Sequence, residues 1–187
     1  MTDSAVPGQM WGVAGLSEVS GTGLEFEALF RAELGYVWKT LERLGVPSRD
    51  VEDVAHDVFV AVYRNFTHYD RTRPIRPWLC GFAYRTASDY RRLARNRYER
   101  TAHDGDMDAP ESDRAARRIE ARDLALRALD RVELERRVVL MMHDIDGHGA
   151  PDIARELEIP VNTVYSRLRL ARDEFRRAVD ELQRGAA

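Results

Sequence analysis

Apolar residues recur three and four residues apart along almost the whole chain, and this spacing most constrains the fold. The first such segment runs from Phe30 to Leu44 and is followed by Gly45 and Pro47, which stop helices. A second begins after Ser48, a candidate helix cap, and a third includes Pro77 in its first turn. No stretch shows the apolar–polar alternation of a half-buried strand. The chain is therefore predicted to be all-α.

Two of the expected helices carry apolar stripes suited to a core. Each stripe stays on one helical face, because its members are spaced by three or four residues. The expected buried side chains are Val51, Val54, Ala55, Val58, Phe59, Val62, Tyr63 and Phe66 in one helix, and Trp78, Leu79, Phe82, Ala83, Thr86, Tyr90 and Leu93 in the next.

The chain is predicted to form two small helical domains joined by a flexible acidic linker. The domains are expected over residues 24–100 and 116–187, with the linker over 101–115, where large apolar residues nearly disappear. Residues 1–23 are expected to be a disordered N-terminal tail. They contain no Lys or Arg, so they lack the basic region of a signal peptide. No apolar run approaches the roughly 20 residues needed to span a membrane.

Positive charge is concentrated in one part of a chain whose net charge is −3. Residues 71–100 carry nine arginines against Asp89 and Glu99, a local charge of +7. A basic patch of this kind binds phosphates whatever the total charge. Lys39 is the only lysine, so the positive charge is almost all arginine, which suits bidentate contacts with phosphate and guanine.

The segment Ile159–Arg172 is the strongest functional signal. A short helix is expected over Asp152–Leu157, Pro160 interrupts the pattern, and Asn162 is a good cap for a second, arginine-bearing helix. This layout is typical of a helix-turn-helix, whose second helix enters the major groove. The alternative is an ordinary helical hairpin with a solvated arginine face. The candidate DNA-contacting residues are Asn162, Thr163, Tyr165, Ser166, Arg167, Arg169 and Arg172.

A second candidate surface is the helix that begins near Pro77. Aromatic residues, including Trp78 and Tyr84, are interleaved there with Arg85, Arg92 and Arg95. Stacking side chains combined with arginine are what unpaired bases require, so the pattern indicates single-stranded or melted DNA. Because Trp78 also lies on the apolar stripe, a role in the core is the favoured alternative for it.

Two further clusters admit more than one interpretation. Asp50, Glu52, Asp53 and Asp57 form either a solvated first turn or a docking face for a basic partner helix. His143, Asp144, Asp146 and His148 could bind a metal in a phosphohydrolase, although a polar turn between helices is the favoured interpretation. Cys80 is the single cysteine, so neither an intramolecular disulfide nor a cysteine-rich zinc site is possible. No cofactor, metal or catalytic residue is expected.

Three stretches resemble segments of the extracytoplasmic-function (ECF) sigma factors, a group of the sigma-70 family. Residues 51–64, VEDVAHDVFVAVYR, are similar to the family's region 2.2. Residues 78–92, from Trp78-Leu79 to Asp89-Tyr90-Arg91-Arg92, are similar to regions 2.3 and 2.4. Residues 153–172, with Ile159-Pro160 and TVYSRLRLAR, are similar to region 4.2. The three occur in the family's order and spacing.

The resemblance implies a transcription initiation factor without enzymatic activity. Its first domain would dock on the β′ clamp helices of core RNA polymerase and melt the −10 element; its second would bind the β flap and read the −35 element about two turns of DNA away. The implied polymerase contacts are Asp50, Glu52, Asp53, Asp57, Phe59 and Arg64. The implied −10 contacts are Trp78, Tyr84, Arg85, Ser88, Asp89, Arg92 and Arg95, and the −35 contacts are the helix-turn-helix residues given above.

The resemblance also implies control by an anti-sigma factor and a cytoplasmic protein, which such a partner can hold at the inner membrane. The chain departs from the family pattern at several positions, among them Arg85 in place of Asn and Glu158 in place of the turn Gly. These departures affect the promoter sequence that is preferred. The alternative function is a stand-alone helix-turn-helix regulator, which would have no need of the aromatic–arginine helix.

Overall fold

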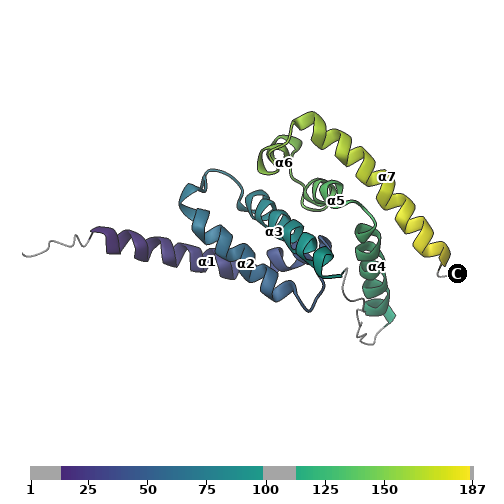
Figure 1. Cartoon of the computed structure of the whole chain (residues 1–187), viewed down its shortest axis with the longest axis horizontal. Coiled ribbons are helices and arrows are strands. Elements are labelled where there is room, and N and C mark those ends of the chain that lie inside the picture. Colours follow the sequence, from purple (N-terminus) through teal and green to yellow (C-terminus); the bar gives the residue numbers. More distant parts are fainter. Residues whose placement is uncertain (1–13, 99–112, 186–187) are drawn as a thin grey trace, which may run out of the picture. The chain divides into compact units, whose positions relative to one another are not determined.

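The computed structural model describes the backbone of residues 14–98 and 113–185, with side chains for residues 23–94 and 120–185. Every regular element in these ranges is a helix (Figure 1), so the prediction of an all-α chain is confirmed. The elements are α1 (Ala14–Arg43), α2 (Val51–Asn65), the 3-10 turn η1 (Phe66–His68), α3 (Ile75–Tyr98), α4 (Asp113–Asp130), α5 (Leu134–Leu140), the π-helical turn η2 (Met141–Ile145), α6 (Ala150–Glu156) and α7 (Val161–Gly185).

Contacts divide the chain inside α1 into two compact units, Met1–Glu33 and Leu34–Ala187. The second unit contains all the helices from the end of α1 to α7. We call its described residues 34–98 the amino-terminal half and its described residues 113–185 the carboxy-terminal half. The linker predicted over 101–115 lies largely outside the described residues.

Helix α1 starts well before the position that the sequence pattern indicated. Its backbone is helical from Ala14, so the prediction of a disordered tail is wrong for residues 14–23; residues 1–13 lie outside the described range. Extending an existing helix is easy because only nucleation is costly, and no proline interrupts the segment. At its other end the helix stops before Gly45, whose φ of 82° is a conformation that glycine adopts readily.

The amino-terminal half encloses a core between α1, α2 and α3. The fully buried side chains include Val37 and Leu41 of α1, Val58 of α2 and Leu79 of α3. Six members of the predicted stripes are not fully buried in this core. Tyr63 is 53% exposed and Leu93 is 60% exposed, whereas Trp78, Phe82, Thr86 and Tyr90 are half-buried. The pattern located the stripes correctly but overestimated their width, because α2 and α3 bury narrower faces against each other.

Two helix starts differ from the predicted caps. Helix α2 begins at Val51 with Asp50 at the cap position, not Ser48, and Asp50 accepts a hydrogen bond from the Tyr90 hydroxyl at 2.6 Å. Helix α7 begins at Val161, so Asn162 lies inside the first turn and is not the cap. The amides of Thr163 and Val164 instead donate to the Pro160 carbonyl.

The carboxy-terminal half forms its core from α5, η2, α6 and α7. Its fully buried side chains include Val138, Met141, Ile153 and Val164. A second, smaller cluster joins α4 to the end of α7, and it consists of Ala128, Ala178 and Leu182 with Leu124, Phe175 and Val179 packed against them. Helix α7 is therefore held along its length, which leaves its opposite face available for other contacts. Among the described residues, no helix is long and apolar enough to cross a membrane.

Candidate nucleic-acid interface

The turn between α6 and α7 is a compact helix-turn-helix connection. Ile159 N–H donates to the Ala154 carbonyl at 2.9 Å, and Glu158 has a φ of 56°. A hydrogen bond back to the last turn of a helix, next to one left-handed residue, is the Schellman arrangement that usually contains glycine. Glu158 thus occupies the backbone conformation that explains the glycine of the family pattern. The predicted helix-turn-helix is present in the structure.

Helix α7 presents a polar face opposite its buried stripe. Val164, Leu168 and Ala171 point into the core, so residues on the far side of the helix are exposed. Tyr165 is 56% exposed and Arg169 is exposed as well. Arg169 forms no ion pair with any residue that the structure describes. The remaining exposed candidates on this face are Asn162 and Ser166. This face has the shape and chemistry of a major-groove reading surface.

Arg167 lies at the edge of this face and forms an ion pair within the carboxy-terminal half. Its guanidinium contacts the Glu135 carboxylate of α5, and its side chain is only 24% exposed. Thr163, also partly buried, accepts a hydrogen bond at its carbonyl from the Ser166 hydroxyl at 3.0 Å. Arg167 therefore joins α5 to α7 in this conformation, and Arg169 is the freer of the two adjacent arginines.

Arg172 is also paired inside the carboxy-terminal half. Its Nε and Nη2 donate to the two oxygens of Asp144 at 2.8 and 2.6 Å, a bidentate arrangement. His143 Nδ1 lies 2.7 Å from the same carboxylate. Hydrogen bonding from Arg172, and to a lesser degree from His143, holds the pKa of Asp144 below its ordinary value. The pair fixes the turn after α5 against the middle of α7.

Trp78 on α3 belongs to a row of aromatic side chains. Its ring centroid lies 4.9 Å from that of Tyr69 and 4.9 Å from that of Phe82, the latter in an edge-on arrangement. The Arg85 guanidinium then lies over the Phe82 ring at 4.9 Å. Aromatic rings with a stacked arginine form a platform of the kind on which unpaired bases stack. Trp78 thus contributes to packing and to this half-exposed platform at the same time.

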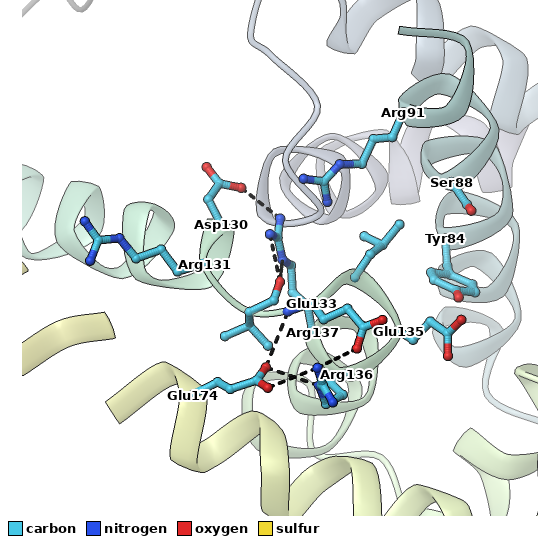
Figure 2. A pocket seen from close by; sticks show the side chains of 12 residues that line it. Tyr84, Ser88, Arg91, Asp130, Arg131, Glu133, Glu135, Arg136, Arg137 and Glu174 are labelled. Atoms are coloured by element: carbon cyan, nitrogen blue, oxygen red, sulfur yellow. Dashed lines mark hydrogen bonds and ion pairs between the residues drawn. The ribbon is translucent and has the colours of Figure 1, made fainter. Parts of the chain in front are cut away.

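Three other −10 candidates face the carboxy-terminal half. Figure 2 shows Tyr84 and Ser88 of α3 beside a cavity of about 470 Å³ whose other lining residues include Glu135, Arg137 and Glu174. Arg85 reaches the end of α6, where its Nη1 donates to the Glu156 carbonyl at 3.3 Å. Burial raises the pKa of the Tyr84 hydroxyl, with a further contribution from Glu135.

The last candidates on α3 lie on its open surface or beyond the described side chains. Asp89 and Arg92 form an exposed pair at 3.1 Å, one helical turn apart. The side chain of Arg95 lies outside the described residues. Sequence reasoning missed Phe82, which lies between Trp78 and the Arg85 guanidinium in the aromatic row, because its position on the apolar stripe indicated only a core role.

Helix α2 presents the predicted acidic face. Glu52, Asp53, Asp57 and Arg64 are exposed on it, as the sequence pattern indicated. Phe59 is a correction to the predicted polymerase contacts, since only 4% of it is exposed and it packs in the core. Tyr63, predicted to be buried, is instead the large aromatic side chain exposed on the same side of α2 as Glu52.

The His–Asp residues of the carboxy-terminal half are engaged in separate interactions. Asp144 pairs with Arg172, whereas Asp146 accepts a hydrogen bond from the Tyr36 hydroxyl at 2.7 Å. Nε2 of His148 is buried without a hydrogen-bond partner, and burial lowers the pKa of this imidazole. Among the described residues, no three potential metal ligands gather in one place. These contacts agree with the interpretation as a polar turn.

The fold and these surfaces are typical of a DNA-binding protein that has a helix-turn-helix and a separate aromatic platform. The sequence matches the family Sigma-70 region 2 over residues 29–97 and the family Sigma-70, region 4 over residues 122–175. The ECF RNA polymerase sigma factor SigM of Mycobacterium tuberculosis is 27% identical over 169 residues, covering 90% of this chain and 84% of SigM.

Two solved structures share the fold. The structure of CnrH in complex with the cytosolic domain of CnrY has a TM-score of 0.61 and 25% identity, covering 87% of this chain and 92% of that chain. The sigma factor RpoE in complex with the anti-sigma factor NepR from Bartonella quintana has a TM-score of 0.67 and 14% identity, covering 83% and 97%. This chain belongs to the sigma-70 family, in its ECF group.

Proposed function

We propose that this protein directs core RNA polymerase to specific promoters through DNA contacts that are divided between its two halves. Helix α7 reads the −35 duplex with Asn162, Tyr165, Ser166 and Arg169, and the aromatic row on α3 captures the melted −10 strand. The acidic face of α2 docks on the basic β′ clamp helices, while the carboxy-terminal half engages the β flap. The observation that carries the proposal is the exposed polar face of α7 in a chain that matches both sigma regions in order.

Run-off transcription with purified core polymerase tests this proposal. The expected result is a transcript of defined length only when the protein, core polymerase and a cognate promoter are combined. A stand-alone regulator would protect its site from nuclease without polymerase and would support no transcript. That second pattern would overturn the proposal in favour of the alternative function.

We also infer that an anti-sigma factor controls this protein and that it acts in the cytoplasm, where such a partner can hold it at the inner membrane. The RpoE of the solved complex is bound to an anti-sigma factor, which supports the first inference. A partner of this kind would compete with core polymerase for the acidic face of α2. Pull-down with tagged protein, with and without added core polymerase, would reveal a partner that core polymerase displaces; a partner that stays bound to the holoenzyme would contradict the inference.

A further inference from the structure

A basic pocket of about 350 Å³ lies within the Leu34–Ala187 unit, where α1, the start of α3 and the end of η2 come together. Three cationic side chains line it, Lys39 and Arg43 of α1 and Arg76 of α3, against the carboxylate of Asp146. An excess of positive charge in a concave site raises the local concentration of anions. None of these four residues belongs to the proposed DNA or polymerase surfaces, so the basic pocket lies outside the proposed function.

Two of the cations lie on one face of α1. Lys39 is the only lysine of the chain, and it is exposed and forms no ion pair with any residue in the described ranges. Arg43 follows it by four residues, so the two side chains leave the helix one turn apart. Arg43 Nη1 lies 3.5 Å from Asp146 Oδ1, which is longer than an ordinary hydrogen bond. Both cations therefore retain positive charge for an external anion.

Tyr36 holds the other two charged side chains of the basic pocket in place. The Arg76 guanidinium lies 5.1 Å from the centroid of the Tyr36 ring, and the Tyr36 hydroxyl donates to Asp146 Oδ2 at 2.7 Å. Burial raises the pKa of this hydroxyl, so it stays protonated and continues to donate to the carboxylate. Because Arg76 is already oriented, it loses less side-chain entropy when it binds an anion.

Gly35 leaves space in the basic pocket. It lines the pocket and precedes Lys39 by one turn in the interior of α1. Glycine inside a helix lowers stability relative to alanine. A Cβ added to Gly35 would have no atom within 4 Å, and its φ is not positive, so neither close packing nor backbone conformation requires this glycine. The missing side chain instead leaves room for a ligand beside Lys39.

We propose that the basic pocket binds a small molecule with a terminal phosphate or diphosphate group. Lys39 supplies a compact positive charge, and Arg43 and Arg76 supply guanidinium N–H groups, a combination that binds phosphate oxygens. The volume lies at the lower end of the roughly 300–1,000 Å³ of ligand pockets, which suits a compact anion. A terminal phosphate can enter such a pocket, whereas an internal phosphodiester of DNA has a sugar on each side. The ligand is therefore a free phosphate compound and not the promoter backbone.

The single lysine allows the basic pocket to be probed by chemical labelling of the full chain. The aldehyde of pyridoxal 5′-phosphate condenses with a lysine amine with loss of water, and borohydride then reduces the imine to a stable amine. Mass spectrometry of the peptide that contains Lys39 measures the extent of labelling. Lys39 should react at least about tenfold faster with pyridoxal 5′-phosphate than with pyridoxal, because a bound phosphate holds the aldehyde beside the amine. Pyrophosphate should suppress the faster reaction.

Three variants test whether the basic pocket causes this preference. Gly35→Leu fills the space without a change of charge and keeps a good helix former, so the reaction with pyridoxal 5′-phosphate should fall to the rate of pyridoxal. Arg76→Gln, at an exposed position, removes one phosphate donor and should slow only the phosphate-bearing reagent. Arg184→Gln removes the same charge from the exposed end of α7, outside the pocket, and should behave as the wild type. Circular dichroism checks the helical fold of each variant.

Equal rates of Lys39 labelling by the two reagents, or no protection by pyrophosphate, would overturn the inference. A preference for pyridoxal 5′-phosphate that persists unchanged in both Gly35→Leu and Arg76→Gln would also overturn it. Stronger protection by a short oligonucleotide without terminal phosphates than by pyrophosphate, at equal phosphate concentration, would assign the pocket to the DNA backbone and exclude the small-molecule ligand. These readouts need neither polymerase nor a promoter, so they are independent of the proposed function.

Discussion

At the scale of single residues, the structure distinguishes two arginines that the sequence pattern treats alike. Arg167 and Arg169 both stand in the region 4.2 pattern, but Arg167 contacts Glu135 whereas Arg169 is exposed with no ion pair in the described part of the chain. We expect Arg169→Ala to weaken −35-dependent promoter binding by about 1–3 kcal/mol, the value of a lost bidentate base contact. This loss is measured by comparing how tightly the holoenzyme, which is core polymerase with this protein bound, binds promoters with an intact and with a mutated −35 element.

Two controls accompany this prediction. Arg184→Ala removes an equal charge from the exposed end of α7 and should leave the preference for the −35 sequence unchanged. Arg167→Ala should mainly lower the melting temperature of the protein, because it breaks a contact between α5 and α7. Equal losses of −35 preference in the Arg169 and Arg184 variants would show that the effect is general charge and not base recognition.

The Asp144–Arg172 pair predicts a pH dependence of stability. The pKa of Asp144 lies below its ordinary value of 3.8 in the folded protein, so the pair contributes stability above about pH 4 and loses it as the pH falls through the lowered pKa. The melting temperature of Asp144→Asn should therefore fall below that of the wild type at neutral pH, and the difference should shrink as the pH drops below about 4. A difference of constant size over that range would contradict the assignment.

Much of the candidate site could be predicted residue by residue, and the exceptions have physical causes. Exposed acids on α2 and polar residues on α7 followed from helical spacing alone, because position on a helix fixes which way a side chain points. Tyr63 was predicted to be buried with Phe59 on one stripe but is exposed, whereas Phe59 is buried as the stripe indicated and so lies off the acidic face on which the resemblance placed it. Local spacing also gives no sign that Glu135 and Asp144 would pair with Arg167 and Arg172, since those contacts join separate helices.

At the scale of elements, the turn of the helix-turn-helix carries strain at Glu158. A left-handed conformation costs a residue with a Cβ roughly 1–2 kcal/mol, and glycine escapes this cost while losing some chain entropy. Glu158→Gly should therefore raise the free energy of unfolding by about 0.5–1 kcal/mol, measured by urea denaturation. Glu158→Ala is the control, because it removes the same exposed carboxylate but keeps the Cβ. Equal effects of the two substitutions would refute strain as the cause.

Helix existence could be predicted from the sequence more reliably than helix ends. Every long apolar stripe corresponds to a helix, since a 3.6-residue period can bury one face only in that conformation. The starts of α1 at Ala14, of α2 after Asp50 and of α7 after Pro160 differed from the predicted positions, because apolar spacing locates a helix without fixing its first residue. Asp50 makes no side-chain cap hydrogen bond and instead accepts one from the Tyr90 hydroxyl of α3.

At the scale of the whole molecule, substitutions at two glycines test whether the amino-terminal and carboxy-terminal halves are in contact. Gly45 and Gly147 have similar positive φ values of 82° and 75°, but an added Cβ at Gly45 would meet Asp130 and Arg137, whereas Gly147 has open space. Gly45→Ala should lower the free energy of unfolding by about 1–3 kcal/mol more than Gly147→Ala, because it adds a clash to the same backbone strain. Thermal or urea unfolding measures both. Equal losses would indicate that Asp130 and Arg137 do not lie against Gly45 in solution.

The sequence also predicted two domains, but not that the described residues 34–98 and 113–185 would belong to one compact unit. Each half has its own buried core, which apolar spacing reveals, whereas the contacts between the halves are polar and join positions far apart in the chain. Polar pairs of this kind leave no periodic signal.

The most direct measurement of the central claim is a footprint of the holoenzyme on a cognate promoter, combined with permanganate probing of unpaired thymines. We predict protection across the −35 element together with reactive thymines at the −10 element, and neither signal when the protein is added without core polymerase. Protection by the protein alone, or −35 protection by the holoenzyme without any unpaired thymines at −10, would contradict the claim that one half reads −35 while the other melts −10.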